Sequence, residues 1–322
     1  MASDKERYTE FCRGVYVPLQ LQPWWLDAVC GGPDQWSVAL ACDGADQIAG
    51  VLPYFLTRRR GLRVIQLPPF TAYAGPWLQY PKPLSLKGNS RYSFEHRMYK
   101  QLITQLPRVA LFHQTFRPEI QNWLPFYWAG FHQTTRYTAL LPDTADLSAL
   151  YKGLKHTVRT DLKTAARATE VVRENDPALL FRLNGASFAR KRLRQPYDRE
   201  TFLRLDAALV ERRQSAGFIA RDRQTGAPHA GLYLAFDNRQ ASVLLAGFDP
   251  TLGRQSRALH GVYWEAICFC SERGLSLDFE GSMDAGIGRV FRAFGAQLTP
   301  YFRVWKAGNR VLEWVLLLKA RV

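Results

Sequence analysis

The sequence lacks the features that mark several protein classes. It has only five cysteines among 322 residues, an odd number with no CxxC pair, and its six histidines show no metal-ligand spacing. We therefore expect no disulfide framework and no metal site, and a reduced, cytoplasmic location is the simplest interpretation. No stretch approaches the roughly 20 apolar residues of a membrane span. The charged segment 1–7 has no apolar core, so we expect neither a signal peptide nor an integral membrane span.

Acidic residues are in the minority, because 28 aspartates and glutamates stand against 43 lysines and arginines, a net charge of +15. This excess predicts an anionic partner, which is a nucleic acid, a phosphorylated cofactor or a membrane surface. The cations are densest between Lys152 and Arg213, where 15 lysines and arginines accompany 8 acidic residues. No helix-turn-helix, zinc-finger, RRM or KH signature accompanies them, which disfavours nucleic-acid binding as the main task.

Common catalytic signatures are also absent. The sequence has no G-x-S-x-G motif for a nucleophilic serine, no Walker loop and no Rossmann fingerprint. Apolar residues make up 47% of the chain and aromatic residues 13%, so the chain is expected to bury a sizeable core. Its length predicts two domains.

The C-terminal half has the clearest order of elements. Three apolar strands separated by short Thr-Gly and Asp-Asn turns predict an antiparallel meander. A helical pattern then ends at Gly274, and the strand after it predicts a parallel pair joined by a right-handed crossover. The predicted order is strand, strand, strand, helix, strand, helix, strand, strand, over residues 217–223, 230–236, 241–248, 258–272, 275–279, 287–294, 299–305 and 311–318.

The N-terminal half repeats this order more faintly. Gly130 and Gly295 both stop a helix before a strand, and they are 165 residues apart. We therefore predict an α/β protein with mixed sheets, built from two copies of one fold over residues 1–141 and 142–322. The predicted N-terminal elements are strands 36–42, 48–56 and 62–67, helix 90–106, strand 109–114, helix 119–129 and strand 131–141.

A long basic helix over residues 145–168 is predicted to connect the two copies. Apolar residues recur along it at three and four residues and form one stripe. Cations recur at the same spacing, and each pair of like charges lowers the stability of a helix by about a few tenths of a kcal/mol. A functional reason would explain why they are present. We interpret the charged face as an anion-facing surface, with an ordinary solvated surface as the alternative. The cations on that face are Lys152, Lys155, Arg159, Lys163 and Arg167.

Several motifs, taken together and in order, resemble one family. The Fem-like branch of the GNAT acyltransferases has a D-F-x-G-S … G-x-x-x-F-(K/R)-x-x-F-G run, which segments 277–282 and 288–296 resemble. Segments 156–165 and 263–274 resemble two helices of this branch, and segment 68–77 is similar to one of its loops. The branch groups peptidoglycan peptidyltransferases with related bacterial acetyltransferases. The resemblance implies two tandem GNAT-like domains and an N-acyltransferase activity.

One loop departs from the pattern of GNAT enzymes that bind coenzyme A. Those enzymes carry a Q/R-x-x-G-x-G/A loop whose backbone amides hold a pyrophosphate at a helix N-terminus. In the matching loop, which contains Arg254 and Arg257, Arg257 and Leu259 replace the two glycines. We expect the two arginines to bind phosphate by their side chains. The donor is either acyl-CoA, as a co-substrate with no tightly bound cofactor, or aminoacyl-tRNA, which the Fem-like peptidyltransferases use.

Acyl transfer to an amine requires a base, donors for the developing oxyanion and positioning of both substrates. The resemblance places the acyl group where strands 241–248 and 275–279 diverge. Alternation along the second strand puts Asp278 and Glu280 on one face, where two carboxylates raise one another's pKa. Glu280 is the predicted base or amine ligand. The alternative is a structural salt bridge at Asp278 and a helix cap at Glu280.

Cations and one aromatic residue complete the predicted site. The resemblance gives Arg292, on the helix after this strand, the role of holding a phosphate or the developing oxyanion, while Arg289 is expected to face solvent. Arg159 and Lys163 are predicted to bind an anionic substrate. Tyr73 is predicted to line the cleft between the domains, with ordinary loop packing as the alternative.

We therefore predict an N-acyltransferase that moves an acyl or aminoacyl group from a phosphate-bearing donor to the amine of a small molecule or peptide. Attack is direct, without a metal and without a covalent enzyme intermediate. The rival hypothesis is a non-catalytic protein that binds anions or nucleic acid on a degenerate GNAT scaffold. Glu280 and Arg292 facing one pocket would favour the enzyme, whereas a continuous basic surface would favour the binding protein.

Overall fold

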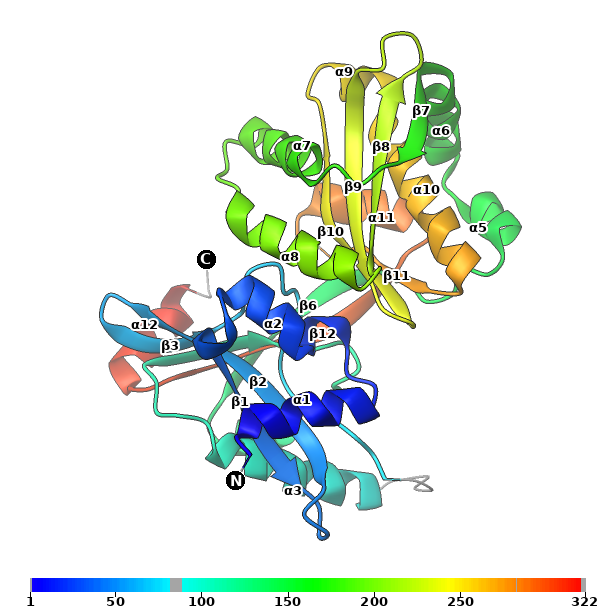
Figure 1. Ribbon diagram of the computed structural model, residues 1–322. Coiled ribbons are helices and arrows are strands. Elements are labelled where there is room, and N and C mark those ends of the chain that lie inside the picture. The colour runs from blue at the N-terminus through cyan, green and yellow to red at the C-terminus, as the bar shows by residue number, and fades with distance from the viewer. Residues whose placement is uncertain (1, 82–88, 282, 320–322) are drawn as a thin grey trace. The chain divides into compact units, whose positions relative to one another are not determined.

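The computed structural model describes residues 2–81, 89–281 and 283–319 (Figure 1). The chain divides into two compact units. Unit 1 comprises Met1–Arg136 and Pro300–Val322, and unit 2 comprises Tyr137–Thr299. Within the described ranges, no helix combines the length and the apolar character that crossing a membrane requires.

Two strands have residues in both units: β6 (His132–Leu141) and β12 (Gln297–Ala307). The last five residues of β12 pair antiparallel with β5 (Leu111–Thr115). This pairing places the C-terminal segment in unit 1, so the compact units differ there from the predicted boundaries of 1–141 and 142–322. Such a pairing joins residues about 190 positions apart and leaves no mark in the local sequence pattern.

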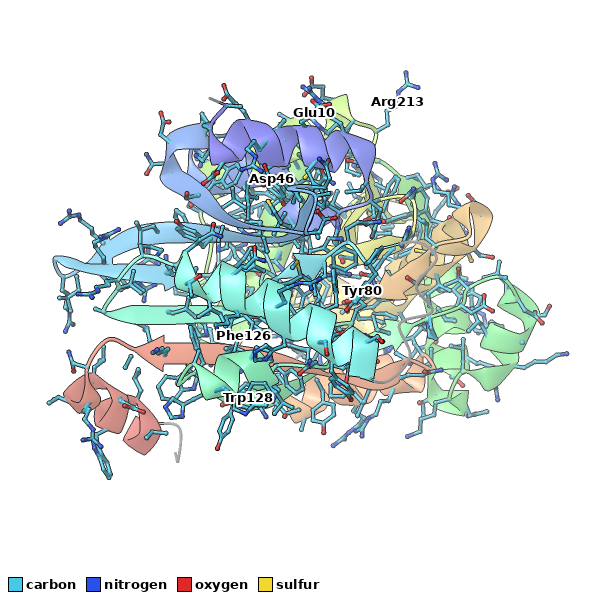
Figure 2. The ribbon with its side chains drawn as sticks, turned by 90° about the horizontal axis from the view of Figure 1, so that it is seen from below. Glu10, Asp46, Tyr80, Phe126, Trp128 and Arg213 are labelled. Carbon is cyan, nitrogen blue, oxygen red and sulfur yellow. The ribbon has the colours of Figure 1, made fainter. Side chains whose placement is uncertain are left out.

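Unit 1 is a mixed sheet covered by helices. Its strands are ordered β1-β2-β3-β5-β12, with the short β4 on β2. Figure 2 shows α3 lying over the sheet. Met98 and Leu102 of this helix belong to one apolar core with Ile65 and Phe112 of the sheet. The remaining elements are α1 (Asp4–Gly14), α2 (Pro23–Cys30), β1 (Trp36–Cys42), β2 (Ile48–Arg59), β3 (Leu62–Gln66), β4 (Trp77–Leu78), α3 (Asn89–Thr104), α4 (Leu124–Trp128) and α12 (Arg310–Lys319).

The predicted strand 311–318 is wrong, because this segment belongs to helix α12. The side-chain oxygen of Asn309 accepts a hydrogen bond from the backbone N–H of Leu312 at 2.9 Å, which caps the helix. Glu313 then binds His132 of β6 at 2.6 Å. A short run of apolar residues does not by itself separate a helix from a strand, and the cap at Asn309 was the signal that the sequence analysis overlooked.

Unit 2 has the strand order β6-β11-β10-β9-β8-β7. The predicted meander and crossover are confirmed, since β8, β9 and β10 pair antiparallel and β10 and β11 pair in parallel. The elements of this unit are α5 (Leu147–Gly153), α6 (His156–Ala168), β7 (Thr169–Arg173), α7 (Pro177–Arg190), α8 (Arg199–Glu211), β8 (Ser215–Asp222), β9 (Pro228–Phe236), β10 (Gln240–Phe248), α9 (Leu252–Ser256), α10 (Ala258–Arg273), β11 (Ser276–Asp278) and α11 (Ala285–Ala293).

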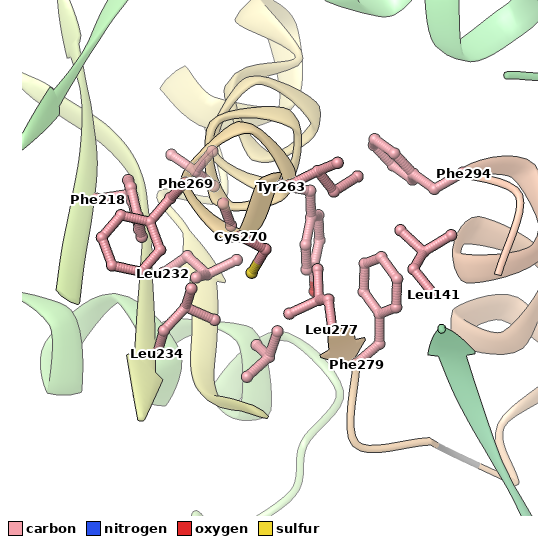
Figure 3. Close-up of a cluster of buried hydrophobic side chains, with 14 of the residues drawn as sticks. Leu141, Phe218, Leu232, Leu234, Tyr263, Phe269, Cys270, Leu277, Phe279 and Phe294 are labelled. Carbon is pink, nitrogen blue, oxygen red and sulfur yellow. The ribbon is translucent and has the colours of Figure 1, made fainter. Parts of the chain in front are cut away.

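The main core of unit 2 lies between α10 and the sheet. Figure 3 shows Tyr263 of α10 beside Leu277 and Phe279, which come from β11 and the residue after it. Phe279 stacks on Phe291 of α11 with 4.8 Å between ring centroids. These aromatic contacts pack α11 against the residue that follows β11. The sequence analysis predicted site residues in this segment.

The predicted connector helix 145–168 is two helices, α5 and α6, and the prediction of one continuous helix is wrong. The chain is extended at Leu154 and Lys155, with ψ near 141° at both. The backbone N–H of Lys155 leaves the helical pattern and donates to the carbonyl oxygen of Ala293 at 3.0 Å. The apolar stripe is nevertheless buried, as predicted, at Leu154, Val158, Leu162 and Ala165.

Candidate functional site

Strands β10 and β11 run side by side only over three residues each. Residues 240–242 pair in parallel with residues 276–278, where β11 ends. β10 continues to Phe248, and its register with β9 shifts between Val243 and Leu245, which marks a β-bulge. From residue 243 onward, the edge of β10 that faced β11 has no strand partner among the described residues. β10 therefore continues past the end of β11, as an opening between the two predicted strands requires.

This open edge of β10 is a source of backbone hydrogen-bond donors. Unpaired strand edges present N–H groups, and preorganised N–H groups stabilise negative charge that develops on a carbonyl oxygen. Helix α7 holds this part of β10 in place, since Asn184 Nδ2 donates to the carbonyl oxygen of Ala246 at 3.0 Å. At Gly247 an added Cβ would lie 2.2 Å from the carbonyl oxygen of Leu183. The close approach of α7 therefore requires a glycine at this position.

Asp278 is buried at the end of β11, and its carboxylate binds groups of the neighbouring segments. Its carboxylate accepts hydrogen bonds from the Thr138 hydroxyl at 2.6 Å and from the backbone N–H of Glu280 at 2.8 Å. The strand ends at Asp278 and Glu280 has a φ of 51°, so strand alternation does not extend to Glu280 and that argument for a shared face is wrong. The next helix is capped by Asp284, which overturns the alternative of a cap at Glu280.

Glu280 is partly buried near the segment that joins α7 to α8. Burial and the negative charge of Glu280 raise the pKa of Tyr197, in that segment, to about 12, so the Tyr197 hydroxyl is protonated at neutral pH. Lys191 Nζ, from the same segment, binds Asp284 Oδ2 at 2.9 Å and ties the segment to the start of α11. The sequence analysis did not name Tyr197 or Lys191 as site residues. A possible signal in the sequence is the basic run at residues 190–194, which lies within the cation-dense range noted above.

Arg292 lies in the last turn of α11 and is exposed. The negative end of the helix dipole stabilises a cation there. In the part of the chain that the structure describes, Arg292 forms no ion pair with a carboxylate. Arg289, one turn earlier, is exposed as predicted. The charge of Arg292 is therefore available to an anionic ligand.

The predicted phosphate loop forms the short helix α9, followed by Arg257. Arg257 has a φ of 59°, the left-handed backbone that glycine adopts most easily, and α10 begins at the next residue. The Arg257 side chain lies 3.4 Å from Asp161, which offsets part of its charge, whereas Arg254 is exposed to solvent. The loop thus keeps a bend typical of a phosphate-binding loop, and Arg254 is the better placed of the two arginines for a phosphate.

The two candidates on α6 differ in environment. Arg159 Nη1 donates to the carbonyl oxygens of Lys152 and Leu154, both at 2.8 Å. These are the carbonyls that the end of α5 leaves unpaired, so Arg159 caps that helix. Lys163 is exposed and lines a groove of about 460 Å³ formed by α6, β7 and α10. Of the two, Lys163 is the one available to a ligand.

Tyr73 lies inside unit 1. It is buried, and its ring meets the ring of Tyr301 edge to face with 5.2 Å between centroids. Its backbone N–H donates to Gln20 Oε1 at 2.9 Å. These contacts agree with the alternative interpretation of Tyr73, that of loop packing.

Comparisons with known proteins agree with this geometry. Residues 149–288 match the family described as the acetyltransferase (GNAT) domain. The fold is similar to the crystal structure of FemX, with 12% identity, a TM-score of 0.64, and coverage of 94% of this chain and 96% of that one. No curated protein sequence matches the chain.

Two further solved structures share the fold. A C-terminal domain described as that of a lysylphosphatidylglycerol synthetase from Agrobacterium fabrum has 15% identity and a TM-score of 0.56, with 98% of this chain and 95% of that one covered. L-PGS from Bacillus licheniformis has 10% identity and a TM-score of 0.53, with 88% of each chain covered. The resemblance seen in the sequence is thus supported: residues 149–288 match a GNAT acetyltransferase domain, and the fold is similar to that of FemX over nearly the whole chain.

Proposed function

We propose that this protein transfers an acyl or aminoacyl group from a phosphate-bearing donor, acyl-CoA or aminoacyl-tRNA, to an amine. The observation that carries the proposal is that β11 ends after three residues paired with β10, while β10 continues to Phe248 with a β-bulge. The open edge beyond residue 243 provides N–H donors for the carbonyl oxygen of the donor. Glu280 and Tyr197 come together next to the end of β11.

The chemistry needs no group beyond these residues and the two substrates. The amine nitrogen attacks the donor carbonyl, and the N–C bond forms as the carbonyl π electrons move onto oxygen. Collapse of this tetrahedral intermediate breaks the C–S bond of a thioester or the C–O bond of an aminoacyl ester. Glu280 accepts the proton that the amine loses. We assign to the hydroxyl of Tyr197, which is protonated at neutral pH, the donation of a proton to the leaving group.

The phosphates of the donor require cations. Arg292 and Arg254 are exposed, and the N-terminus of α10 follows the bend at Arg257. The loop lacks the glycines through which GNAT enzymes bring backbone close to a pyrophosphate, and Arg257 is engaged with Asp161. These features favour aminoacyl-tRNA over acyl-CoA as the donor. One solved structure with this fold is also named for an aminoacylated product, lysylphosphatidylglycerol.

A transfer assay tests the proposal. Purified protein is incubated with amine acceptors and either labelled acyl-CoA or labelled aminoacyl-tRNA, and the product amide is quantified. We expect the Glu280→Gln variant to lower kcat by roughly 10²- to 10⁴-fold, the range for removal of a general base. Glu200→Gln, at an exposed position on α8, is the matched control and should be as active as the wild type.

The non-catalytic alternative makes a different prediction for the same preparations. The observation that favours it is the exposed and unengaged Arg292, together with the net charge of +15. A binding protein would retain tRNA or another polyanion with a steep salt dependence and form no amide with any donor. Equal affinity of wild type and Glu280→Gln, with no turnover in either, would support this alternative and contradict the transferase.

A further inference from the structure

Unit 1 contains a cavity of about 560 Å³ whose lining includes none of the candidate site residues described above. It is within the size range of small-molecule sites. Its wall combines apolar side chains with arginine, histidine and amide groups. The lining residues include Arg59, Gln66, Leu111, His113, Arg303 and Trp305.

The sheet register explains why these side chains face the cavity. His113 of β5 is directly opposite Trp305 of β12, and Arg303 lies two residues before Trp305. Residues two apart on a strand share a face. The neighbouring residue Phe112 belongs to the core under α3, so the cavity is on the other face of the sheet. Leu316 of α12 contributes to its wall.

Positive charge collects around His113 without an acidic partner. The side-chain Nε of Arg303 contacts His113 Nε2. Burial, and after it the charges of Arg303, Arg136 and Arg59 in that order, lower the pKa of His113 to about 4. Burial and Arg136 also lower the pKa of Arg303. Within the described ranges, none of the three arginines forms an ion pair with a carboxylate.

The acidic residue of α12, Glu313, does not pair with these arginines. Glu313 binds His132 at 2.6 Å, and the His132 ring stacks on Trp305 with 4.4 Å between centroids. Guanidinium groups that surround one histidine repel one another, and Arg136, which is partly buried, also loses hydration. A bound anion removes both costs, because guanidinium groups bind phosphate oxygens in pairs of parallel hydrogen bonds.

We propose that this cavity of unit 1 binds the phosphate group of a phosphate ester, held by Arg59 and Arg303 with the charge of Arg136 nearby, and with the apolar part of the ester against Leu111 and Trp305. The chemistry fits a soluble phosphorylated molecule and a phospholipid headgroup alike. A lipid source is supported by α12, which contributes Leu316 to the cavity wall and exposes the large apolar residues Val311 and Trp314 to solvent elsewhere on the same helix. The proposal stands independently of the transfer site in unit 2.

Titration calorimetry with inorganic pyrophosphate tests the site. We expect saturable binding by the wild type and a loss of at least about tenfold in affinity for Arg303→Gln, since a charge-assisted hydrogen-bond pair is removed. Arg58→Gln is the matched control, because Arg58 is next to Arg59 on β2 and so points to the other face. Arg59→Gln, at the exposed end of β2, provides a second variant if Arg303→Gln does not fold.

Two further measurements distinguish a lipid headgroup from a soluble phosphate ester and test where the phosphate binds. Flotation with phosphatidylcholine vesicles, with and without phosphatidylglycerol, identifies a lipid headgroup if only the anionic vesicles retain the wild type and Arg303→Gln reduces retention. Binding of pyrophosphate without vesicle retention identifies a soluble ester. Proton NMR of His113 should show its pKa rise when pyrophosphate binds. Absence of binding to every probe, or equal binding by Arg303→Gln and Arg58→Gln, would overturn the proposal.

Discussion

Asp278 positions the backbone of Glu280, the proposed base. Its buried carboxylate binds the Thr138 hydroxyl and the N–H of Glu280, and the Thr138 hydroxyl in turn accepts from the backbone N–H of Gly281 at 2.8 Å. An added Cβ at Gly281 would lie 2.2 Å from Cα of Thr138. These contacts leave the backbone at Glu280 little freedom, so Asp278 and Thr138 are positioning residues.

We expect Thr138→Val to lower the free energy of unfolding by about 1–3 kcal/mol, because the buried Asp278 carboxylate loses one hydrogen bond and the N–H of Gly281 loses its acceptor. Urea denaturation at neutral pH measures the change. Thr164→Val, on the exposed side of α6, is the control and should change stability by less than about 0.5 kcal/mol. An equal change in both variants would contradict the positioning role.

Arg292 is the residue on which the proposed binding of donor phosphate depends most. Arg292→Ala should reduce kcat/KM by at least about tenfold, the loss for one charge-assisted contact, with the melting temperature unchanged because the side chain is exposed. Arg289→Ala, on the same helix and also exposed, should retain activity. If Arg292→Ala instead lowers the melting temperature and Arg289→Ala does not, Arg292 has a structural role.

The lowered pKa of His113 predicts that the stability of the protein depends on pH in the acidic range. Its folded pKa of about 4 lies below its ordinary value of 6.5, owing to burial and to Arg303, Arg136 and Arg59. Between these two values the unfolded chain binds a proton that the folded chain does not, so stability falls as the pH drops from 6.5 to 4. His113→Gln removes this contribution. Its unfolding free energy should therefore decline less steeply than that of the wild type in urea denaturation across this range, and parallel curves would contradict the assignment.

At the scale of elements, the break between α5 and α6 gives Arg159 its role. The guanidinium binds two carbonyl groups at the end of α5. We expect Arg159→Ala to lower the unfolding free energy by about 0.5–1.5 kcal/mol, as for the loss of a helix cap. Lys163→Ala, about one turn further along α6 at an exposed position, should have a smaller effect. Equal losses in thermal or urea denaturation would show that Arg159 does not act as a cap.

The elements that the sequence predicted correctly are those with strong local signals. The meander from β8 to β10 has turns with glycine or asparagine, and α10 ends at Gly274, which has a φ of 63°. The break at Leu154 was missed because the apolar period continues through it, and tertiary contacts decide the extended backbone there. The helix α12 was missed because its apolar residues also fit a strand.

The sequence predicted which segments form the candidate site, but not the arrangement of their backbone and side chains. The place where β10 and β11 diverge followed from the order of elements and from the motifs around Phe279 and Phe294. The turn of the backbone at Glu280 and the approach of Tyr197 were not predictable, because both depend on contacts between segments far apart in the sequence. Pair contacts of this kind leave no periodic pattern.

At the scale of the whole molecule, the fold class followed from two repeats of one order of elements, and the GNAT domain at residues 149–288 agrees with it. The division into units did not follow, because the last strand returns to β5 of unit 1. The excess of positive charge is distributed over both units. Unit 2 presents exposed cations near the proposed transfer site, and unit 1 holds three arginines around His113.

Hydrogen–deuterium exchange of the backbone amides in residues 243–248 tests the central claim most directly, with the protein saturated in turn by acyl-CoA and by aminoacyl-tRNA. The account predicts that the donor used in turnover slows exchange in this open edge of β10, and that exchange in β9, already paired on both sides, changes little. Unchanged exchange in residues 243–248 under a saturating donor that supports turnover would show that the acyl group binds elsewhere.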